Sequence, residues 1–279
     1  MKLNFGQKLA YYYALLFSTP RLAKLHYLLL KTSLRGLGVL NYYDDVVSGE
    51  NHFVSKVLPH IVQNEAPVFF DVGANQGSYS LLLANRFPGA RIFAFEPHPK
   101  NYQTLSRLSM NNFSSFAMAL SDTEGFLPLY DYADEDGTTN ASLHEEVFTH
   151  IRHREVKAHR VKVNTLDEVI QSLKIGTVDF LKIDTEGNEL AILAGGKVNL
   201  QEGRIGAIQF EFNEMNVISH SFFYDFWKLL ENYYLFRLLP RGLLPLSNDP
   251  VYTELFAYQN ILAVPKNRPR VLHKLQRYQ

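Results

Sequence analysis

The 279-residue sequence contains no cysteine and carries no net charge. Without cysteine the chain can form no disulfide, no thiolate metal site and no cysteine nucleophile. Its 28 basic and 28 acidic residues balance, so bulk electrostatics predicts no nucleic-acid partner. The best apolar run near the N-terminus covers only residues 9–17, which is too short to span a bilayer, and no secretory pattern is present. We therefore expect a soluble, cytoplasmic protein.

Acidic residues are also missing from the first part of the chain. Residues 1–43 contain no acidic residue and six basic ones, namely Lys2, Lys8, Arg21, Lys24, Lys31 and Arg35. We expect residues 1–60 to form a helical N-terminal extension, with a break at residues 18–20, whose tyrosines and leucines pack on the following domain. Peripheral membrane contact through these basic helices is the alternative.

A glycine-containing turn follows the first apolar strand, which we expect at residues 68–72. The turn has the sequence DVGANQG and leads into an expected helix at residues 78–87. A dinucleotide site requires G-x-G-x-x-G, whereas Gly73 and Gly77 lie four residues apart with Asn75 between them. Asp71 would repel a diphosphate but suits a cationic group, such as the amino group of S-adenosylmethionine. We expect a cofactor site formed by Asp71, Gly73, Asn75, Gly77, Tyr79 and Ser80.

Two more acidic residues follow the next two expected strands. Residues 90–95 end at Glu96-Pro97, and Glu96 lies 23 residues after Gly73, close to the offset at which an acid receives ribose hydroxyls. We expect a third strand at residues 115–120, which ends at Ser121-Asp122. We expect Asp122 to accept a hydrogen bond from an adenine amino group. Glu96, Pro97, Ser121 and Asp122 therefore complete the expected cofactor site.

Alternating strands and helices over the rest of the chain indicate an α/β fold with a doubly wound, Rossmann-like sheet. Further strands are expected at residues 177–183, 205–212, 233–239 and 260–264, and helices at residues 100–111 and 219–231. The pattern is interrupted by two shorter strands, residues 126–132 and 156–163. We expect the polar loop between them, residues 133–146, to cover an acceptor molecule. Residues 61–279 would form one domain with a seven-stranded sheet.

Four separated motifs resemble those of the FkbM methyltransferase family. They are DVGANQG at residues 71–77, FEP at 95–97, ALSD at 119–122 and LKIDTEGNE at 181–189. The resemblance covers about residues 65–265. It implies a class I S-adenosylmethionine-dependent methyltransferase with strand order 3-2-1-4-5-7-6 and an antiparallel last strand. The family typically methylates hydroxyl oxygens, so the resemblance implies a sugar, glycan or natural-product acceptor.

The candidate catalytic residues lie at the ends of the fourth and fifth strands, where the ligand crevice of such a sheet opens. They are Lys182, Asp184, Glu186 and Glu211. An alcohol must lose its proton during methyl transfer, and we rank Asp184 first as the base and Glu211 next. His98 and His144 are second choices.

Metal activation is the alternative to a base. Asp184, Glu211 and Asn213 would supply the oxygen ligands that Mg²⁺ prefers. Because one residue separates Glu211 from Asn213, this set resembles catechol-type methyltransferases only partly, and we do not favour a metal. His150, His153 and His159 lie in charged surroundings and favour a solvated helix or a lid over a metal site.

Two other functions remain open on the sequence. An N-methyltransferase, or a methyltransferase that acts on protein or nucleic acid, would share the same cofactor half. Against methylation of purine or glutamine nitrogen, the fourth strand ends in Asp184-Thr185-Glu186-Gly187, not in an Asn/Asp-Pro-Pro-Tyr sequence. A non-catalytic, membrane-associated cofactor-binding module would lack polar residues at this strand end, and here they are present.

Overall fold

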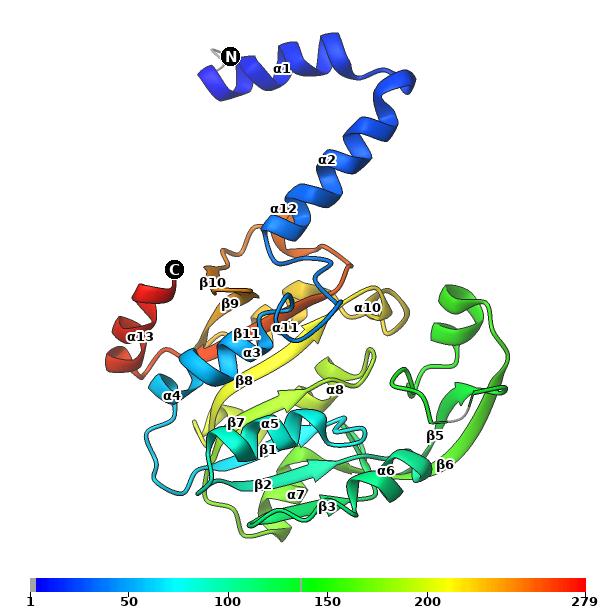
Figure 1. Ribbon diagram of the computed structural model, residues 1–279, viewed down its shortest axis with the longest axis vertical. Helices are drawn as coiled ribbons and strands as arrows, with labels where there is room; N and C mark the ends of the chain where they lie inside the picture. Colours follow the sequence, from blue (N-terminus) through cyan, green and yellow to red (C-terminus); the bar gives the residue numbers. More distant parts are fainter. Residues whose placement is uncertain (1–3, 136) are drawn as a thin grey trace.

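The computed structural model describes residues 4–135 and 137–279, so Lys2 of the basic segment and Asp136 of the polar loop lie outside the described residues. An eight-stranded sheet forms its centre (Figure 1). The strands are β1 Val68–Val72, β2 Arg91–Phe95, β3 Phe113–Phe116, β7 Val178–Ile183, β8 Ile205–Phe212, β9 Tyr233–Leu239, β10 Gly242–Pro245 and β11 Gln259–Pro265.

The order of the sheet is β10-β9-β11-β8-β7-β1-β2-β3. The five strands from β3 to β8 run parallel, and β11 pairs antiparallel with both β8 and β9. This arrangement confirms the predicted Rossmann-like fold and its order 3-2-1-4-5-7-6. The eighth strand, β10, forms a hairpin with β9 at the sheet edge. Its four residues, Gly-Leu-Leu-Pro, are too few to show a strand period.

Helices cover both faces of the sheet, so side chains from each strand pack alternately into two cores. In β1, Phe70 joins one core and Phe69 the other. On the Phe70 side lie α7 Leu166–Ser172, α8 Glu189–Ala194, α9 Lys197–Gln201 and α11 Phe223–Leu229. On the Phe69 side lie η2 Phe53–Val57, α4 Leu58–Ile61, α5 Ser78–Arg86 and α13 Pro269–Leu275. Because parallel strands are buried on both faces, they are apolar without alternation.

The predicted third strand is divided between two sheets. After β3 the chain turns, and β4 Ala119–Ser121 pairs with β6 Val156–Thr165 instead of β2. With β5 Gly125–Tyr132, these strands form a second sheet of order β4-β6-β5, which stands beside the β2–β3 end of the main sheet (Figure 1). The prediction of one strand over residues 115–120 is therefore wrong, and residues 121–122 follow β4 rather than an edge strand of the main sheet.

Two predicted helices are shorter than expected. The helix after β2 is α6 Pro99–Leu105, which ends six residues before the predicted end at 111. The predicted helix over residues 219–231 is replaced by α10 Met215–Ile218 and α11. His220 between them has φ +52°, a left-handed conformation that a continuous helix excludes. The remaining short elements are α12 Pro250–Thr253, the π-helix η3 Val147–Arg152 and the 3₁₀ helix η4 Gln276–Tyr278.

The N-terminal 60 residues divide into two parts. The arm, as we call α1 Phe5–Phe17, the turn η1 Pro20–Leu22 and α2 Ala23–Gly36, contains no buried residue in any of its helices. It projects away from the sheet in Figure 1. The break at residues 18–20 is confirmed, but the prediction that this apolar segment packs on the domain is wrong.

The inner segment, residues 37–62, packs on the sheet. It contains α3 Glu50–His52, η2 and α4, and its Phe53, Val54 and Val57 belong to the Phe69-side core. Gly49 has φ +87°, and a Cβ there would lie 2.5 Å from the carbonyl oxygen of Leu239, so only glycine allows this close approach. No helix of the described residues is long and apolar enough to cross a membrane. The cytoplasmic location stays a prediction.

Candidate active site

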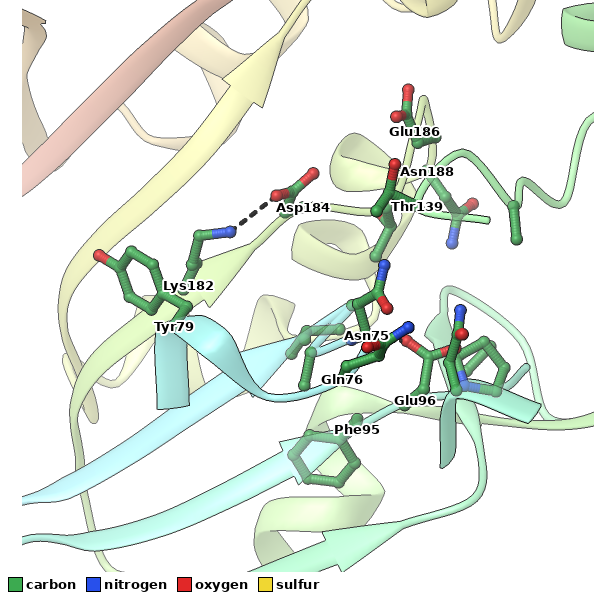
Figure 2. Close-up of a pocket in the computed structure, with 18 of the residues that line it drawn as sticks. Asn75, Gln76, Tyr79, Phe95, Glu96, Thr139, Lys182, Asp184, Glu186 and Asn188 are labelled. Carbon is green, nitrogen blue, oxygen red and sulfur yellow. Dashed lines mark hydrogen bonds and ion pairs between the residues drawn. The ribbon is translucent and has the colours of Figure 1, made fainter. Parts of the chain in front are cut away.

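A cavity of about 550 Å³ opens at the carboxyl ends of β1, β2 and β7. Its walls include the glycine turn after β1, the 182–188 segment at the end of β7 and the loop between β5 and β6, and residues of the inner segment, the β2 end, α6 and β4 also line it. Figure 2 shows Tyr79, Lys182 and Asp184 on one side, with Asn75, Gln76 and Glu96 across from them. The position agrees with the general rule for ligands in open α/β sheets.

The glycine turn contains left-handed backbone conformations that suit the residue types found there. Gly73 has φ +80°, and a Cβ there would stand 1.8 Å from the carbonyl oxygen of Asp184. Asn75, with φ +49°, is a residue type that tolerates the left-handed region. The turn therefore brings the β1 and β7 ends into direct contact, and a side chain at residue 73 would separate them.

Glu96 is the acceptor at the centre of the cofactor half. Its Oε2 accepts a hydrogen bond from the Asn75 backbone N–H at 2.8 Å, and its Oε1 accepts one from the His98 N–H at 2.7 Å. Burial raises the pKa of Glu96 to about 7, although the two hydrogen bonds from backbone N–H groups lower it in part. Each carboxylate oxygen keeps a lone pair for a hydroxyl of a bound molecule.

Asp71 and Ser80 lie beneath the turn and do not line the cavity. Ser80 Oγ donates to Asp71 Oδ2 at 2.6 Å, and both side chains are fully buried. Burial raises the pKa of Asp71, and the positive charge of Lys182 opposes this shift. The structure thus gives Asp71 a supporting position, not the direct contact with a cationic ligand that the sequence predicts.

Lys182 and Asp184 form an ion pair at the end of β7, with 2.8 Å between Nζ and Oδ2 (Figure 2). The ammonium also lies 4.7 Å from the centroid of the Tyr79 ring. Burial lowers the pKa of Lys182, but the charges of Asp184, Glu50, Asp71 and Glu211 together raise it above its ordinary value. Lys182 is therefore a cation at neutral pH. The Asp184 side chain, 32% exposed, is the more open member of the pair.

Glu186 also lines the cavity, two residues after Asp184. Burial and the nearby negative charge of Asp184 raise its pKa to about 8, whereas Arg152, 3.8 Å away, lowers it. Its backbone has φ +54°. The turn is held by Glu189, whose Oε1 accepts from the backbone N–H groups of Thr185 and Gly187 at 2.8 and 3.2 Å. A carboxyl with this pKa can take up and release a proton near neutral pH.

Glu211 is buried behind this wall rather than on it. Burial, and then the charge of Asp184, raise its pKa. Asn213 Nδ2 donates to Glu211 Oε2 at 3.4 Å, and Asn213 Oδ1 accepts from the Met215 N–H at 3.0 Å. The amide oxygen that a Mg²⁺ site would use is thus already engaged. Within residues 4–135 and 137–279, no three His, Cys, Asp or Glu side chains gather as metal ligands. Asp184 lines the cavity, whereas Glu211 and Asn213 do not, so metal activation through these three residues stays the less favoured alternative.

The loop between β5 and β6 supplies the third wall through Thr138, Thr139, Ala141 and Leu143. Asp131, fully buried, accepts hydrogen bonds from the Gly137 and Thr138 N–H groups at 2.7 and 2.9 Å. Ser142 Oγ donates to the Glu186 carbonyl at 2.8 Å. The loop is thus attached to the β7 end.

Some of the remaining predicted residues lie on the cavity wall and others do not. Tyr79 and Pro97 line the cavity, but Gly77, Ser121 and Asp122 do not. Gly77 begins α5, and a Cβ at Gly195 would lie 2.1 Å from the Ser121 carbonyl oxygen, which places Ser121 against a helix end. Asp122 is exposed. The reason is the turn into β4, which directs residues 121–122 away from the β2 end.

Neither candidate histidine lines the cavity. His98 is fully buried, with Nε2 3.5 Å from Asp131 and its ring 4.6 Å from that of His159. Burial lowers the pKa of His144. Both positions indicate support for the loop and the β7 end.

Glu50 and Asn101 are among the residues of the cavity wall that sequence reasoning missed. Glu50, from the inner segment, accepts a hydrogen bond from Gln209 Nε2 at 2.7 Å, and burial raises its pKa. Asn101, on α6, is almost fully buried, and its Oδ1 has no hydrogen-bond partner among the residues that the structure describes. This oxygen is thus an unused acceptor on a residue of the cavity wall. One signal for Glu50 existed, because Asp44, Asp45 and Glu50 are the first acidic residues of the chain.

Comparison with known proteins places this site in a family. Methyltransferase sdnD from Sordaria araneosa is 32% identical over 156 residues, which is 46% of this chain and 60% of that protein. The 2-O-methyltransferase NoeI from Sinorhizobium fredii is 23% identical over 58% of this chain and 70% of its own length. The hexuronic acid methyltransferase AglP from Haloferax volcanii is 25% identical over 53% and 56%.

Residues 71–238 match the methyltransferase FkbM domain. The match begins at Asp71, contains Glu96, Lys182, Asp184 and Glu186, and spans more than half of the chain. It therefore includes the glycine turn and the β7 end, the two walls that carry most of the cavity's polar groups. This chain belongs to the FkbM methyltransferase family.

Proposed function

We propose that this protein transfers the methyl group of S-adenosylmethionine to a hydroxyl oxygen of a sugar, glycan or other small hydroxylated acceptor. One observation carries the proposal: a single cavity joins a buried hydroxyl acceptor, Glu96, to the carboxylates of the β7 end, Asp184 and Glu186. In this proposal Glu96 recognises the nucleoside part of the cofactor, and a carboxylate of the β7 end accepts the proton of the acceptor hydroxyl.

The cofactor half supplies positioning. Glu96, held from both sides by backbone N–H groups, accepts the two ribose hydroxyls. The turn from Gly73 to Gly77 lets the ligand approach the backbone closely. Asn101 Oδ1, buried and without a partner among the described residues, accepts a hydrogen bond from an amino group. These donors and acceptors fit S-adenosylmethionine, which when bound supplies a methyl group on a positively charged sulfur.

The acceptor half supplies the base. As the hydroxyl oxygen bonds to the methyl carbon, the bond from that carbon to sulfur breaks, its electron pair stays on sulfur, and the hydroxyl proton must leave. Glu186 takes this proton, because burial and the negative charge of Asp184 raise its pKa to about 8, which strengthens its carboxylate as a base. Asp184 is held in the ion pair with Lys182. The structure thus favours Glu186 over Asp184, which the sequence ranks first.

The names of two relatives support a hydroxyl on a sugar as the acceptor. One is a 2-O-methyltransferase and the other a hexuronic acid methyltransferase. The carboxyl groups of Asp45, Glu50, Asp184 and Glu186 line the cavity and can accept hydrogen bonds from the hydroxyl groups of such a sugar.

The test is transfer of labelled methyl groups from S-adenosylmethionine to a panel of neutral sugars, uronic acids, glycolipids and polyketides. We expect label on an oxygen of at least one acceptor, located by mass spectrometry. Label on nitrogen alone, or binding of S-adenosylmethionine with no transfer to any acceptor class, would contradict the proposal.

A further inference from the structure

The arm exposes an unusual amount of apolar surface. In α1 every large apolar side chain is exposed, including Leu9 at 63% and Leu16 at 68%, and in α2 Leu28 is 61% exposed. Contiguous apolar patches of this kind are rare on monomeric soluble proteins and mark interaction sites. The rest of the described chain leaves this surface uncovered, since neither helix contains a buried residue.

The charge of the arm has one sign. Lys8, Arg21, Lys24, Lys31 and Arg35 lie between residues 4 and 43, where no acidic residue occurs. In α2 the spacing of Lys24, Lys31 and Arg35 (i, i+7, i+11) places them on one helix face, and Leu25 and Leu29 lie away from it. A basic face next to an apolar one is typical of helices that lie in a membrane interface.

The bend between the two helices is fixed by contacts. The Tyr13 hydroxyl and His26 Nε2 lie 3.1 Å apart across it, and the Tyr13 ring also contacts the rings of Phe17 and His26. Two straight helices joined at one bend can both lie on a single flat surface. Figure 1 shows them projecting together beyond the sheet.

From these observations we propose that the arm docks the protein on the surface of a bilayer that contains anionic lipids. The helices have 13 and 14 residues, about 20 Å each, too short to cross the hydrocarbon core. They therefore lie along the interface, with leucine and aromatic side chains among the acyl chains and lysine and arginine at the headgroup phosphates.

The charge favours a bilayer over a second copy of the arm. Two arms packed together would bring ten positive charges (twice the five described) near one another without one acidic side chain to offset them. An anionic lipid surface offers both the apolar interior and the complementary charge.

The arm is joined firmly to the body beside the cavity. Buried Arg237 donates from NH1 to the Leu37 carbonyl at 3.2 Å, directly after α2. The Leu40 N–H donates to the Tyr258 carbonyl at 2.8 Å. The same inner segment then reaches Asp45 and Glu50 on the cavity wall. Docking of the arm would therefore hold the cavity near the membrane, which suits an acceptor carried on a lipid.

The test measures co-sedimentation of the full-length protein with phosphatidylcholine vesicles that do or do not contain phosphatidylglycerol. We expect binding only to the anionic vesicles and its loss at high salt. Two double variants of the arm, Leu25→Glu/Leu29→Glu and Lys24→Glu/Lys31→Glu, should each bind the anionic vesicles at least about tenfold more weakly than the wild type. Matched controls on exposed positions of the body, Val251→Glu/Tyr252→Glu and Lys197→Glu/Lys228→Glu, should bind like the wild type.

Circular dichroism and binding of S-adenosylhomocysteine show whether each variant is folded, independently of vesicles and of methyl transfer. Equal binding by wild type and arm variants, or no binding to anionic vesicles, would overturn the proposal. A dimer in size-exclusion chromatography that the leucine variant dissociates, without vesicle binding, would assign the arm to a second copy instead.

Discussion

The two halves of the cavity are built in different ways. The cofactor half uses a continuous backbone turn and one carboxylate, Glu96, which is fixed by N–H groups only two and 21 residues away. The acceptor half uses side chains from the inner segment, from the 182–188 segment and from the loop after β5. In the proposed function, local geometry would therefore set the cofactor site, whereas long-range packing would set the acceptor site. Mutations should separate binding from turnover along the same division.

The largest effect is expected in the acceptor half. Glu186→Gln should lower the rate of the chemical step by roughly 10²–10⁴-fold, because the amide cannot accept the hydroxyl proton. Affinity for S-adenosylhomocysteine should stay the same. In the wild type, kcat/KM should rise with pH through about 8, since only the ionised Glu186 is a base. Single-turnover kinetics at a series of pH values measures the rate of the chemical step and its pH dependence. A Glu202→Gln variant, which alters an exposed side chain, serves as the control.

A different pattern would change the assignment. If Glu186→Gln keeps nearly full activity while Asp184→Asn loses it with cofactor affinity intact, the base is Asp184, as the sequence suggests.

The next effect lies in the cofactor half. Glu96→Ala should weaken binding of S-adenosylhomocysteine by about 2–4 kcal/mol, because two charge-assisted bonds to ribose hydroxyls are lost. This corresponds to roughly 30- to 1,000-fold in Kd. Isothermal titration calorimetry measures the change, and a Glu168→Ala variant, which alters an exposed side chain of α7, serves as control. If the Glu96→Ala variant binds S-adenosylhomocysteine as tightly as the wild type, Glu96 does not bind the ribose.

A smaller effect is expected in how the affinity for S-adenosylhomocysteine depends on pH. The pKa of Glu96 is raised to about 7 in the free protein, and the ionised carboxylate accepts hydroxyls better than the acid. Affinity should therefore rise with pH and level off above about 7, by at most about tenfold per pH unit. In Glu96→Gln this slope should vanish. A slope that persists in the variant would assign the titration to another group.

Half of the ten cofactor residues predicted from the sequence line the cavity, namely Gly73, Asn75, Tyr79, Glu96 and Pro97, and there is a physical reason why these were found. Gly73, Asn75 and Glu96 act through backbone conformations and strand ends that neighbouring residues define, so a motif of seven residues and one offset locate them. Glu50 meets Gln209 across 159 residues of sequence, and no local pattern encodes that contact. The errors at Ser121 and Asp122 have the same origin, because pairing of β4 with β6 overrides the continuity of the apolar run.

The inner segment offers the smallest test of this contrast. Glu50→Gln removes one negative charge beside Lys182, while its amide oxygen can still accept from Gln209. The acceptor KM should change several-fold, about 1 kcal/mol, and cofactor affinity should not change, because Glu50 accepts its hydrogen bonds from Gln209 and Ser48 and not from the glycine turn. Steady-state kinetics on the true acceptor measures the shift, with Glu65→Gln, an exposed residue away from the cavity, as control. An equal loss of cofactor affinity would show that the two halves are not separable.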